Sequence, residues 1–252
     1  MSRTTDDGGS CPGEPVSTLP QPGKVGEVFG GVWLPKGEVH LRDHMTSPKG
    51  KRVVEGKLTY QYRKQQAAWD ACDRFRPDWR EGTFADVGAH VGLWSMWWGW
   101  KVSHVVAFEP LPQLRALYRE NVRCLNYDLR PVALGANPGS LRLTFDPTNS
   151  GNTHAADDGE IEVQMSTLDD ELGDDPPPVT VLKVDCEGYE EAVLRGGEGV
   201  IRRDRPVVVV EQKPPRVAGV GWKGGVRFLE GLGYRTVREM SGDHIMVHPF
   251  SG

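Results

Sequence analysis

Carboxylate residues stand at the ends of four short apolar runs of this chain. Asp86 and Glu109 mark the first two runs, and Asp185, Glu187 and Glu211 mark the last two. Such groups can take a proton from a hydroxyl, bind hydroxyls, attract a cationic ligand or coordinate a hard divalent metal. If the runs are parallel strands of one sheet, these groups meet at the edge where such sheets bind ligands. The pattern therefore predicts an acidic ligand site.

The loop D-V-G-A-H-V-G, residues 86–92, resembles a nucleotide-binding turn without its phosphate-binding residues. Gly88 lets a ligand approach the backbone closely, and Gly92 permits tight packing between strand and helix. The loop is not G-x-G-x-x-G, because His90 interrupts it, and it lacks the G-K-[ST] of a P-loop. The Asp86 carboxylate would repel a pyrophosphate at a helix N-terminus. We therefore predict a cationic nucleoside cofactor without phosphate, and S-adenosylmethionine fits this description.

Glu109 follows the next apolar run, about 20 residues after the glycine loop, where dinucleotide folds carry the acid that binds ribose. We predict that Glu109 accepts both ribose hydroxyls and that the adjacent Pro110 belongs to the same site. The alternative is an ordinary glycine turn followed by a capping acid.

Alternating strand and helix patterns position these residues. Residues 179–184 and 206–211 are continuous and β-branched, as in parallel strands covered on both faces. The alternation predicts an α/β fold with a doubly wound open sheet. The other predicted strands are 83–87, 104–108, 128–134, 234–239 and 244–248, with an antiparallel pair at 140–145 and 160–165, and the predicted helices start near 93 and span 112–125, 189–197 and 223–232.

The sequence before the main domain of residues 80–252 predicts a tail, a hairpin and a helix. Residues 1–28, rich in Gly, Pro, Ser and Thr, predict a disordered tail. Within residues 29–79, the segment 30–41 predicts a small hairpin, and apolar residues at helical spacing predict an amphipathic helix over 57–75.

Several segments together resemble the FkbM-type S-adenosylmethionine-dependent methyltransferases over roughly residues 80–212. They are DVGAHVGLW, VVAFEPLPQL, VALG (132–135), STLDDEL (166–172), VLKVDCEGYEEAVLRGG (181–197) and RPVVVVEQ (205–212). The resemblance implies a mostly parallel, seven-stranded, Rossmann-like class I methyltransferase sheet with Leu134 beside the cofactor. In this fold the N-terminal helix, with Tyr60 and Gln61, often covers the cofactor; the alternative is an exposed helix face. The asparagine that is usual in the family's D-x-G-A-N-x-G is replaced by His90 here. His90 either contacts the cofactor, acts as a base or has a structural role.

The resemblance implies an O-methyltransferase, because characterised members act mainly on hydroxyls of sugars and secondary metabolites; similar proteins occur in bacteriophages. Asp185 is our candidate for the base or for the ligand of the acceptor hydroxyl, close to the cofactor. Glu187 either shares this role or caps the next helix, and Glu211 faces the same edge. Alternatively, Asp185, Glu187 and Glu211 bind a divalent metal.

The segment NSGNTH, residues 149–154, is rich in groups that bind hydroxyls. We predict that Asn152, Thr153 and His154 line the acceptor pocket together with Glu211. An ordinary hairpin loop is the alternative.

Composition limits the possible partners. The chain has 252 residues and a formal net charge of −5, which gives no reason to expect a polyanionic partner. No apolar run approaches the roughly 20 residues of a membrane span, no signal-peptide pattern precedes residue 28, and the four cysteines form no C-x-x-C pair. We therefore expect a cytoplasmic enzyme, or one in the host cytoplasm if phage-encoded, acting on a glycan or small hydroxylated molecule and not on a membrane. Nucleic-acid methylation and non-catalytic cofactor binding are the alternatives, and the oligomeric state stays open.

Overall fold

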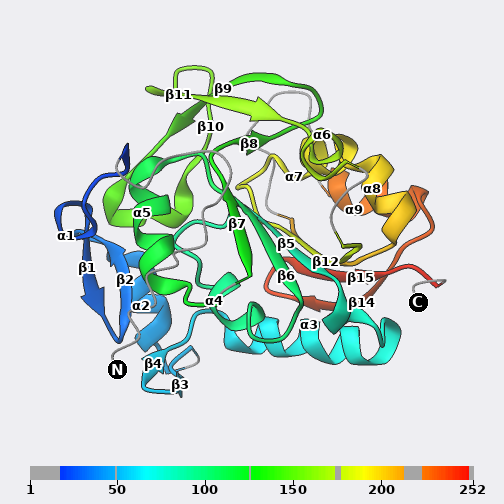
Figure 1. Cartoon of the computed structure of the whole chain (residues 1–252), viewed down its shortest axis with the longest axis horizontal. Helices are drawn as coiled ribbons and strands as arrows, with labels where there is room; N and C mark the ends of the chain where they lie inside the picture. Colours follow the sequence, from blue (N-terminus) through cyan, green and yellow to red (C-terminus); the bar gives the residue numbers. More distant parts are fainter. Residues whose placement is uncertain (1–17, 49, 125, 174–176, 213–222, 250–252) are drawn as a thin grey trace, which may run out of the picture.

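A sheet covered by helices on both faces forms the centre of the computed structural model, and a smaller sheet lies beside it (Figure 1). The structure describes residues 18–48, 50–124, 126–173, 177–212 and 223–249. Most of the predicted tail, residues 1–17, lies outside them. Among the described residues, no helix has the length and apolar character needed to cross a bilayer.

The large sheet has seven strands in the order β14-β15-β13-β12-β5-β6-β7. The pairs from β13 through to β7 are parallel, whereas β15 runs antiparallel to both of its neighbours. This order confirms the predicted doubly wound, mostly parallel sheet and places its topological switch point between β5 and β12. The strands are β5 (Thr83–Val87), β6 (His104–Phe108), β7 (Tyr127–Arg130), β12 (Val179–Val184), β13 (Val207–Glu211), β14 (Arg235–Met240) and β15 (Asp243–Val247).

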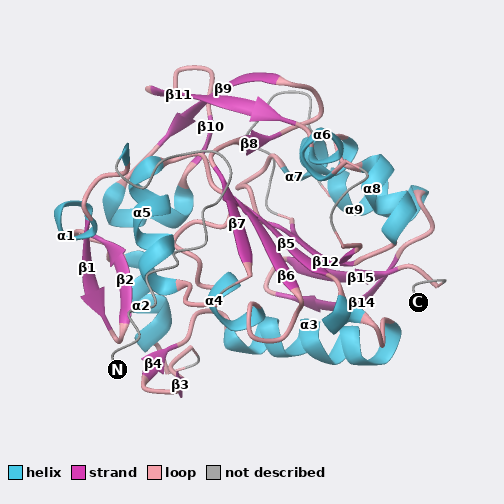
Figure 2. Ribbon diagram, viewed as in Figure 1, coloured by secondary structure: helices cyan, strands magenta, loops and turns pink. Residues whose placement is uncertain are grey.

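Two helical layers bury the two faces of this sheet (Figure 2). One layer contains α3 (Tyr62–Phe75), α4 (Ser95–Trp98) and α5 (Pro112–Asn121), and the other contains α6 (Leu168–Leu172), α7 (Glu190–Arg195), α8 (Glu198–Asp204) and α9 (Gly224–Gly231). Successive strand residues point to opposite faces, so Phe84 packs in the first core and Ala85 in the second. Every residue of β5, β12 and β13 is buried, as expected for strands covered on both faces.

The smaller sheet has the order β10-β9-β11-β8. Its strands are β8 (Ala133–Leu134), β9 (Gly139–Thr144), β10 (His154–Ala155) and β11 (Ile161–Ser166). The antiparallel pairing of β9 with β11 confirms the predicted pair. The single strand predicted at 128–134 is wrong, because β7 ends at Arg130 in the large sheet and β8 joins the small one. Pro131 lies between them and has no N–H to continue a ladder.

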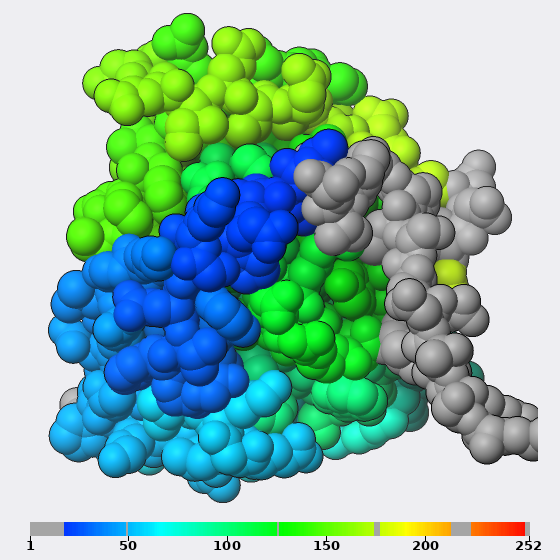
Figure 3. Space-filling model, turned by 60° about the vertical axis from the view of Figure 1, so that its left-hand side comes forward, coloured from blue at the N-terminus to red at the C-terminus, as the bar shows by residue number. Residues whose placement is uncertain are grey.

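Ordered elements begin earlier than predicted at the N-terminal side. Helix α1 (Pro22–Val25) lies within the predicted tail and strand β1 (Gly26–Phe29) begins in it, so the predicted disorder is wrong for residues 22–28. Strand β1 pairs with β2 (Val32–Pro35) around Gly30 and Gly31, both at positive φ. The hairpin therefore spans 26–35 and overlaps only part of the predicted 30–41. The segment covers part of the surface in blue in Figure 3.

The remaining N-terminal elements are short apart from α3. Helix α2 (His40–Thr46) follows the hairpin, and β3 (Val53–Val54) pairs with β4 (Lys57–Leu58). Because β4 occupies 57–58 and Gln61 has φ of +50°, α3 starts at Tyr62 and not at 57.

Other helix boundaries also differ from the predictions. Helix α4 is a single turn, and α5 ends at Asn121 instead of 125. Helix α8 and the 3-10 turn Trp79–Glu81 were not predicted at all.

Candidate active site

A cavity of about 260 Å³ lies beyond the carboxyl ends of the central strands. Strand-end residues 87–90, 108–110, 183, 185–187 and 211 line one side, and residues 40, 41, 60, 132–134 and 149–155 contribute to the other walls. Of the predicted site residues, the lining includes Gly88, His90, Glu109, Pro110, Leu134, Tyr60, Asp185, Glu187, Glu211, Asn152, Thr153 and His154, and it does not include Asp86, Gly92 or Gln61. The sheet edge thus brings most predicted residues together.

The two glycines of the first loop have different roles. Gly88 lines the cavity at φ of +72°, and a Cβ there would lie 2.0 Å from the Asp185 carbonyl oxygen. Only glycine therefore fits at this close approach of two strand ends. Gly92, at φ of +80°, lies against Tyr118 and Val122 instead. Its predicted packing role is supported, with α5 as the partner, and its cofactor contact is not.

Asp86 is fully buried and is not among the residues that line the cavity. Its carboxylate lies 3.1 Å from the Lys183 Nζ and accepts a hydrogen bond of 2.6 Å from the Ser95 hydroxyl. Burial alone would lower the pKa of Lys183, but the carboxylates of Asp86 and Asp185 raise it above its ordinary value. Asp86 is therefore the partner of a buried cation, and its contact with the cofactor stays a prediction.

Lys183 also holds the glycine loop, a role that the sequence interpretation missed. Its Nζ donates to the Gly88 carbonyl at 2.9 Å. Lys183 and Asp86 are cross-strand neighbours in the register of β12 and β5. The sequence did contain a signal for this pair, because charged residues in strands covered on both faces are rare unless they are paired. The lysine lies inside V-T-V-L-K-V and the acid inside T-F-A-D-V.

The negative potential of the cavity comes from other acids. Glu109, Asp185, Glu187 and Glu211 line it, and Lys183 is the cation nearest to them in the lining. A cationic ligand remains favoured and a pyrophosphate disfavoured, although Asp86 is not the reason.

Glu109 is held by the loop that it faces. Its two carboxylate oxygens accept the backbone N–H groups of His90 at 3.0 Å and Leu111 at 2.9 Å. Burial raises the pKa of Glu109 to about 7 despite these two bonds. The carboxylate is therefore fixed at the end of β6, where ribose hydroxyls would be bound.

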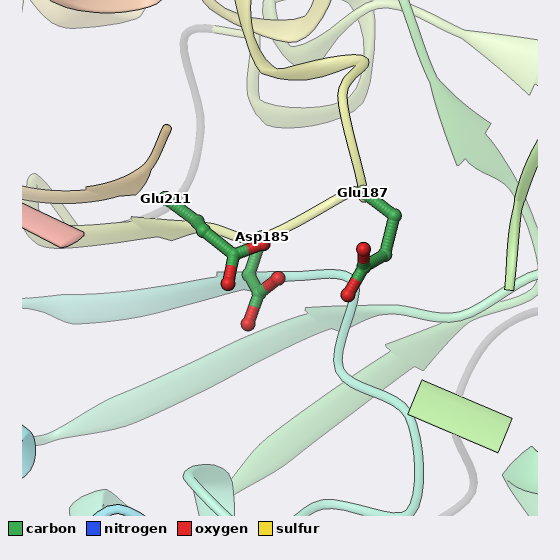
Figure 4. Close-up of side chains that lie close together, drawn as sticks. All are labelled: Asp185, Glu187 and Glu211. Atoms are coloured by element: carbon green, nitrogen blue, oxygen red, sulfur yellow. The ribbon is translucent and has the colours of Figure 1, made fainter. Parts of the chain in front are cut away.

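Three carboxylates converge on one point of the cavity (Figure 4). One oxygen each from Asp185, Glu187 and Glu211 lies within 4.8 Å of the others. Glu187 has φ of +52°, an uncommon conformation for a residue other than glycine. Such a set can accept hydrogen bonds from several hydroxyls, take a proton or coordinate a hard cation.

The turn that precedes helix α7 is held by Glu190, its first residue. Glu190 accepts the N–H groups of Cys186 at 3.0 Å and Gly188 at 2.9 Å. Burial raises the pKa of Glu190 to about 7. The capping alternative for Glu187 is thus not supported, because Glu190 satisfies the turn and Glu187 lines the cavity.

Tyr60 closes the cavity from the N-terminal side. Burial, and then the charges of Asp185 and Glu211, raise the pKa of Tyr60 well above its ordinary value. Gln61 is not among the residues that line the cavity, and its cofactor contact stays a prediction. Its amide donates to the Tyr60 hydroxyl at 3.1 Å and accepts the Trp94 indole N–H at 3.0 Å. Gln61 therefore positions Tyr60.

The predicted acceptor segment lines the opposite wall. Asn152, Thr153 and His154 all face the cavity, so the segment is more than an ordinary hairpin loop. His154 Nδ1 lies 2.7 Å from the Asn152 carbonyl oxygen. The neighbouring Ser150 is fully buried and reaches His90, a contact that the sequence did not reveal.

Comparison with known proteins identifies related chains. A family model described as the methyltransferase FkbM domain matches residues 86–236. Methyltransferase 1 of Beauveria bassiana is 29% identical over 169 residues, covering 56% of this chain and 68% of that protein. The hexuronic acid methyltransferase AglP of Haloferax volcanii is 29% identical over 129 residues, covering 49% of this chain and 53% of that protein.

A solved structure also resembles the chain. The methyltransferase FkbM from Methylobacillus flagellatus shares 18% identity at a TM-score of 0.43, over 66% of this chain and 43% of that one. The chain thus spans about half of AglP and less than half of the solved protein.

Proposed function

This chain belongs to the FkbM methyltransferase domain family, and from that membership we propose that it methylates a hydroxyl of a glycan or small polar metabolite. The observation that carries the proposal is the convergence of Asp185, Glu187 and Glu211 within 4.8 Å in the cavity. Carboxylates so close together suit an acceptor that presents several hydroxyl donors.

The residues fit S-adenosylmethionine as the cofactor. Gly88 exposes backbone to the cavity, and Glu109 offers a fixed carboxylate for ribose. Pro110 and Leu134 supply apolar wall beside it. When bound, this cofactor supplies an electrophilic methyl group on a sulfonium, which the acidic lining would attract.

Asp185 is the proposed general base. It follows β12 at the switch point, and its side chain is 24% exposed toward the cavity. In this role Asp185 takes the proton of the acceptor hydroxyl as the oxygen attacks, while Glu187 and Glu211 bind neighbouring hydroxyls and orient the ring. The Lys183 Nζ lies 3.9 Å from the Asp185 carboxylate.

The same carboxylates favour an uncharged acceptor ring. A uronate carboxylate bound here would face three carboxylates, and like charges in contact cost several kcal/mol. AglP is named a hexuronic acid methyltransferase. For this chain we propose a sugar acceptor without that acid's charge.

An acceptor panel tests this proposal. Tritiated methyl transfer is measured to methyl glucoside, methyl glucuronoside, duplex DNA and RNA. We expect label in the glucoside and at least about tenfold less in the glucuronoside. Preferential labelling of nucleic acid or of the uronate would contradict the proposal. No labelling of any acceptor despite tight cofactor binding would favour the non-catalytic alternative.

Cofactor affinity should depend on pH through Glu109. Its pKa of about 7 means that much of the free protein carries a protonated Glu109 below that pH. The ionised form is the stronger acceptor for ribose hydroxyls, so binding should weaken about tenfold from pH 8 to pH 6. Calorimetry with S-adenosylhomocysteine, whose adenosine is the same, measures this slope. Glu109→Gln should flatten it, and an equal slope in that variant would contradict the assignment.

Removal of metal ions distinguishes Asp185 as a general base from Asp185 as a ligand of a divalent metal. Lys183 already places a positive charge 3.9 Å from Asp185, which disfavours a divalent cation there. We therefore expect turnover to be unchanged after dialysis against EDTA. Loss of turnover that Mg²⁺ restores and K⁺ does not would make Asp185, Glu187 and Glu211 metal ligands instead.

A further inference from the structure

A chain of hydrogen bonds links three elements that are distant in sequence. His90 Nε2 lies 2.9 Å from the Ser150 hydroxyl oxygen. Ser150 donates its hydroxyl to the Glu38 carboxylate and its backbone N–H to the same carboxylate at 2.8 Å. The other Glu38 oxygen accepts the Leu41 N–H at 2.9 Å. Glu38 and Ser150 are 1% and 0% exposed, so water does not compete for these bonds.

Only one assignment of donors and acceptors fits the hydrogen bonds between His90, Ser150 and Glu38. The only hydroxyl hydrogen of Ser150 goes to the Glu38 carboxylate, so the Ser150 oxygen must accept from His90 Nε2–H. The imidazole is neutral at physiological pH, since burial, then the charge of Lys183, lowers the pKa of His90 to about 4. A neutral ring with its hydrogen on Nε2 is therefore a donor to Ser150.

Ser150 makes most of the contacts that hold its loop. We define the acceptor-side loop as residues 147–153, which include Asn152 and Thr153 of the cavity wall. Among the described residues, this loop makes four hydrogen bonds beyond its flanking residues 146 and 154. Ser150 takes part in three of them, and in the fourth the Val39 N–H donates to the Thr148 carbonyl. Without Ser150 and its partners, the loop would keep mainly local bonds.

His90 reaches both halves of the cavity. Its backbone N–H holds Glu109 on the cofactor side, and its side chain holds Ser150 on the acceptor side. The first bond needs only the backbone at residue 90, while the second needs the full length of an imidazole. The asparagine usual in the family is shorter, so it would keep the first bond and lose the second.

We propose that His90 is a positioning residue which, through Ser150 and Glu38, fixes the acceptor-side loop and thereby shapes acceptor binding. This inference rests on the proposed function in one respect: that function identifies this wall of the cavity as the side that binds the acceptor. Its structural content is independent: the His90 side chain orders residues 147–153 and does not bind the cofactor.

Hydrogen exchange read by mass spectrometry tests the proposal on the full chain. Backbone exchange of residues 147–153 is compared in wild type, His90→Asn, Ser150→Ala and the double variant. We expect exchange about tenfold faster in each single variant, because a buried hydrogen bond is lost. The double variant should exchange no faster than Ser150→Ala, since both changes break the same chain.

Two further measurements keep the test specific. Thr148→Ala is the control, because it removes an exposed hydroxyl that bonds only to the neighbouring Asp146. Backbone exchange of residues 147–153 should therefore stay near the wild-type rate in this variant. Affinity for S-adenosylhomocysteine, read by calorimetry, should stay unchanged in His90→Asn. If Ser150→Ala does not fold, Glu38→Gln takes its place, both as a single variant and combined with His90→Asn.

Two results would overturn the inference. One is wild-type exchange of the loop in His90→Asn. The other is an approximately tenfold loss of S-adenosylhomocysteine affinity in that variant with unchanged exchange, which would make His90 a cofactor ligand. Neither readout uses an acceptor or turnover, so failure here is distinct from failure of the proposed methyl transfer.

Discussion

Replacing Asp185 by asparagine should reduce kcat for methyl transfer about 100- to 10,000-fold, the range expected for loss of a general base. Asparagine keeps the size of the side chain and cannot take a proton. Because Glu109 and Gly88 are untouched, affinity for S-adenosylhomocysteine should change little. Single-turnover transfer and calorimetry on the same protein separate the two effects.

Asp170→Asn is the matched control, because Asp170 is an exposed acid on α6 outside the cavity lining. It should behave like wild type. If Asp185→Asn keeps full kcat while Glu211→Gln loses it, the base is Glu211 and our assignment fails. If Asp185→Asn loses cofactor affinity and keeps kcat, Asp185 binds the cofactor only.

Replacing Lys183 by methionine should cost about 3–5 kcal/mol of unfolding free energy, because it leaves the fully buried Asp86 carboxylate without its cation. The substitution also removes the hydrogen bond to the Gly88 carbonyl, so cofactor affinity should fall with stability. Urea unfolding measures the first effect, and calorimetry on the folded fraction measures the second.

A double-mutant cycle identifies the pair as the cause. Asp86→Asn with Lys183→Met removes both charges, and it should cost clearly less than the sum of the single changes. The exposed pair Arg202–Glu198 is the control, and Arg202→Ala should cost under about 1 kcal/mol. A loss below that level for Lys183→Met would show that the ion pair does not hold the loop.

Local pattern determined the sheet more completely than the helices. Strands β5, β6 and β12 have the predicted bounds, because each is a short, mainly apolar run. Every residue of β5 and β12 is buried, and so is every residue of β6 except His104. Helix α8 was missed because G-G-E-G precedes and opens it, and glycine disfavours helix. The tail prediction failed because Gly and Pro in 20–31 form a hairpin and its flanks instead of disorder.

The site was predictable where a side chain lies at a strand end, and not where it depends on a distant partner. Glu109, Asp185 and Glu211 follow from strand positions alone. The pairing of Asp86 with Lys183 could not be predicted locally, because it depends on the register between two strands. The contact between His90 and Ser150 crosses 60 residues, and no local pattern predicts it.

Transfer of a carbon-13 methyl group is the most direct test of the central claim, that this cavity methylates a hydroxyl. Labelled S-adenosylmethionine is incubated with methyl glucoside and wild type or Asp185→Asn, and the product is read by NMR. We expect a methyl ether on a sugar carbon with wild type and almost none with the variant. A labelled methyl on nitrogen or carbon, or equal ether formation by both proteins, would contradict the claim.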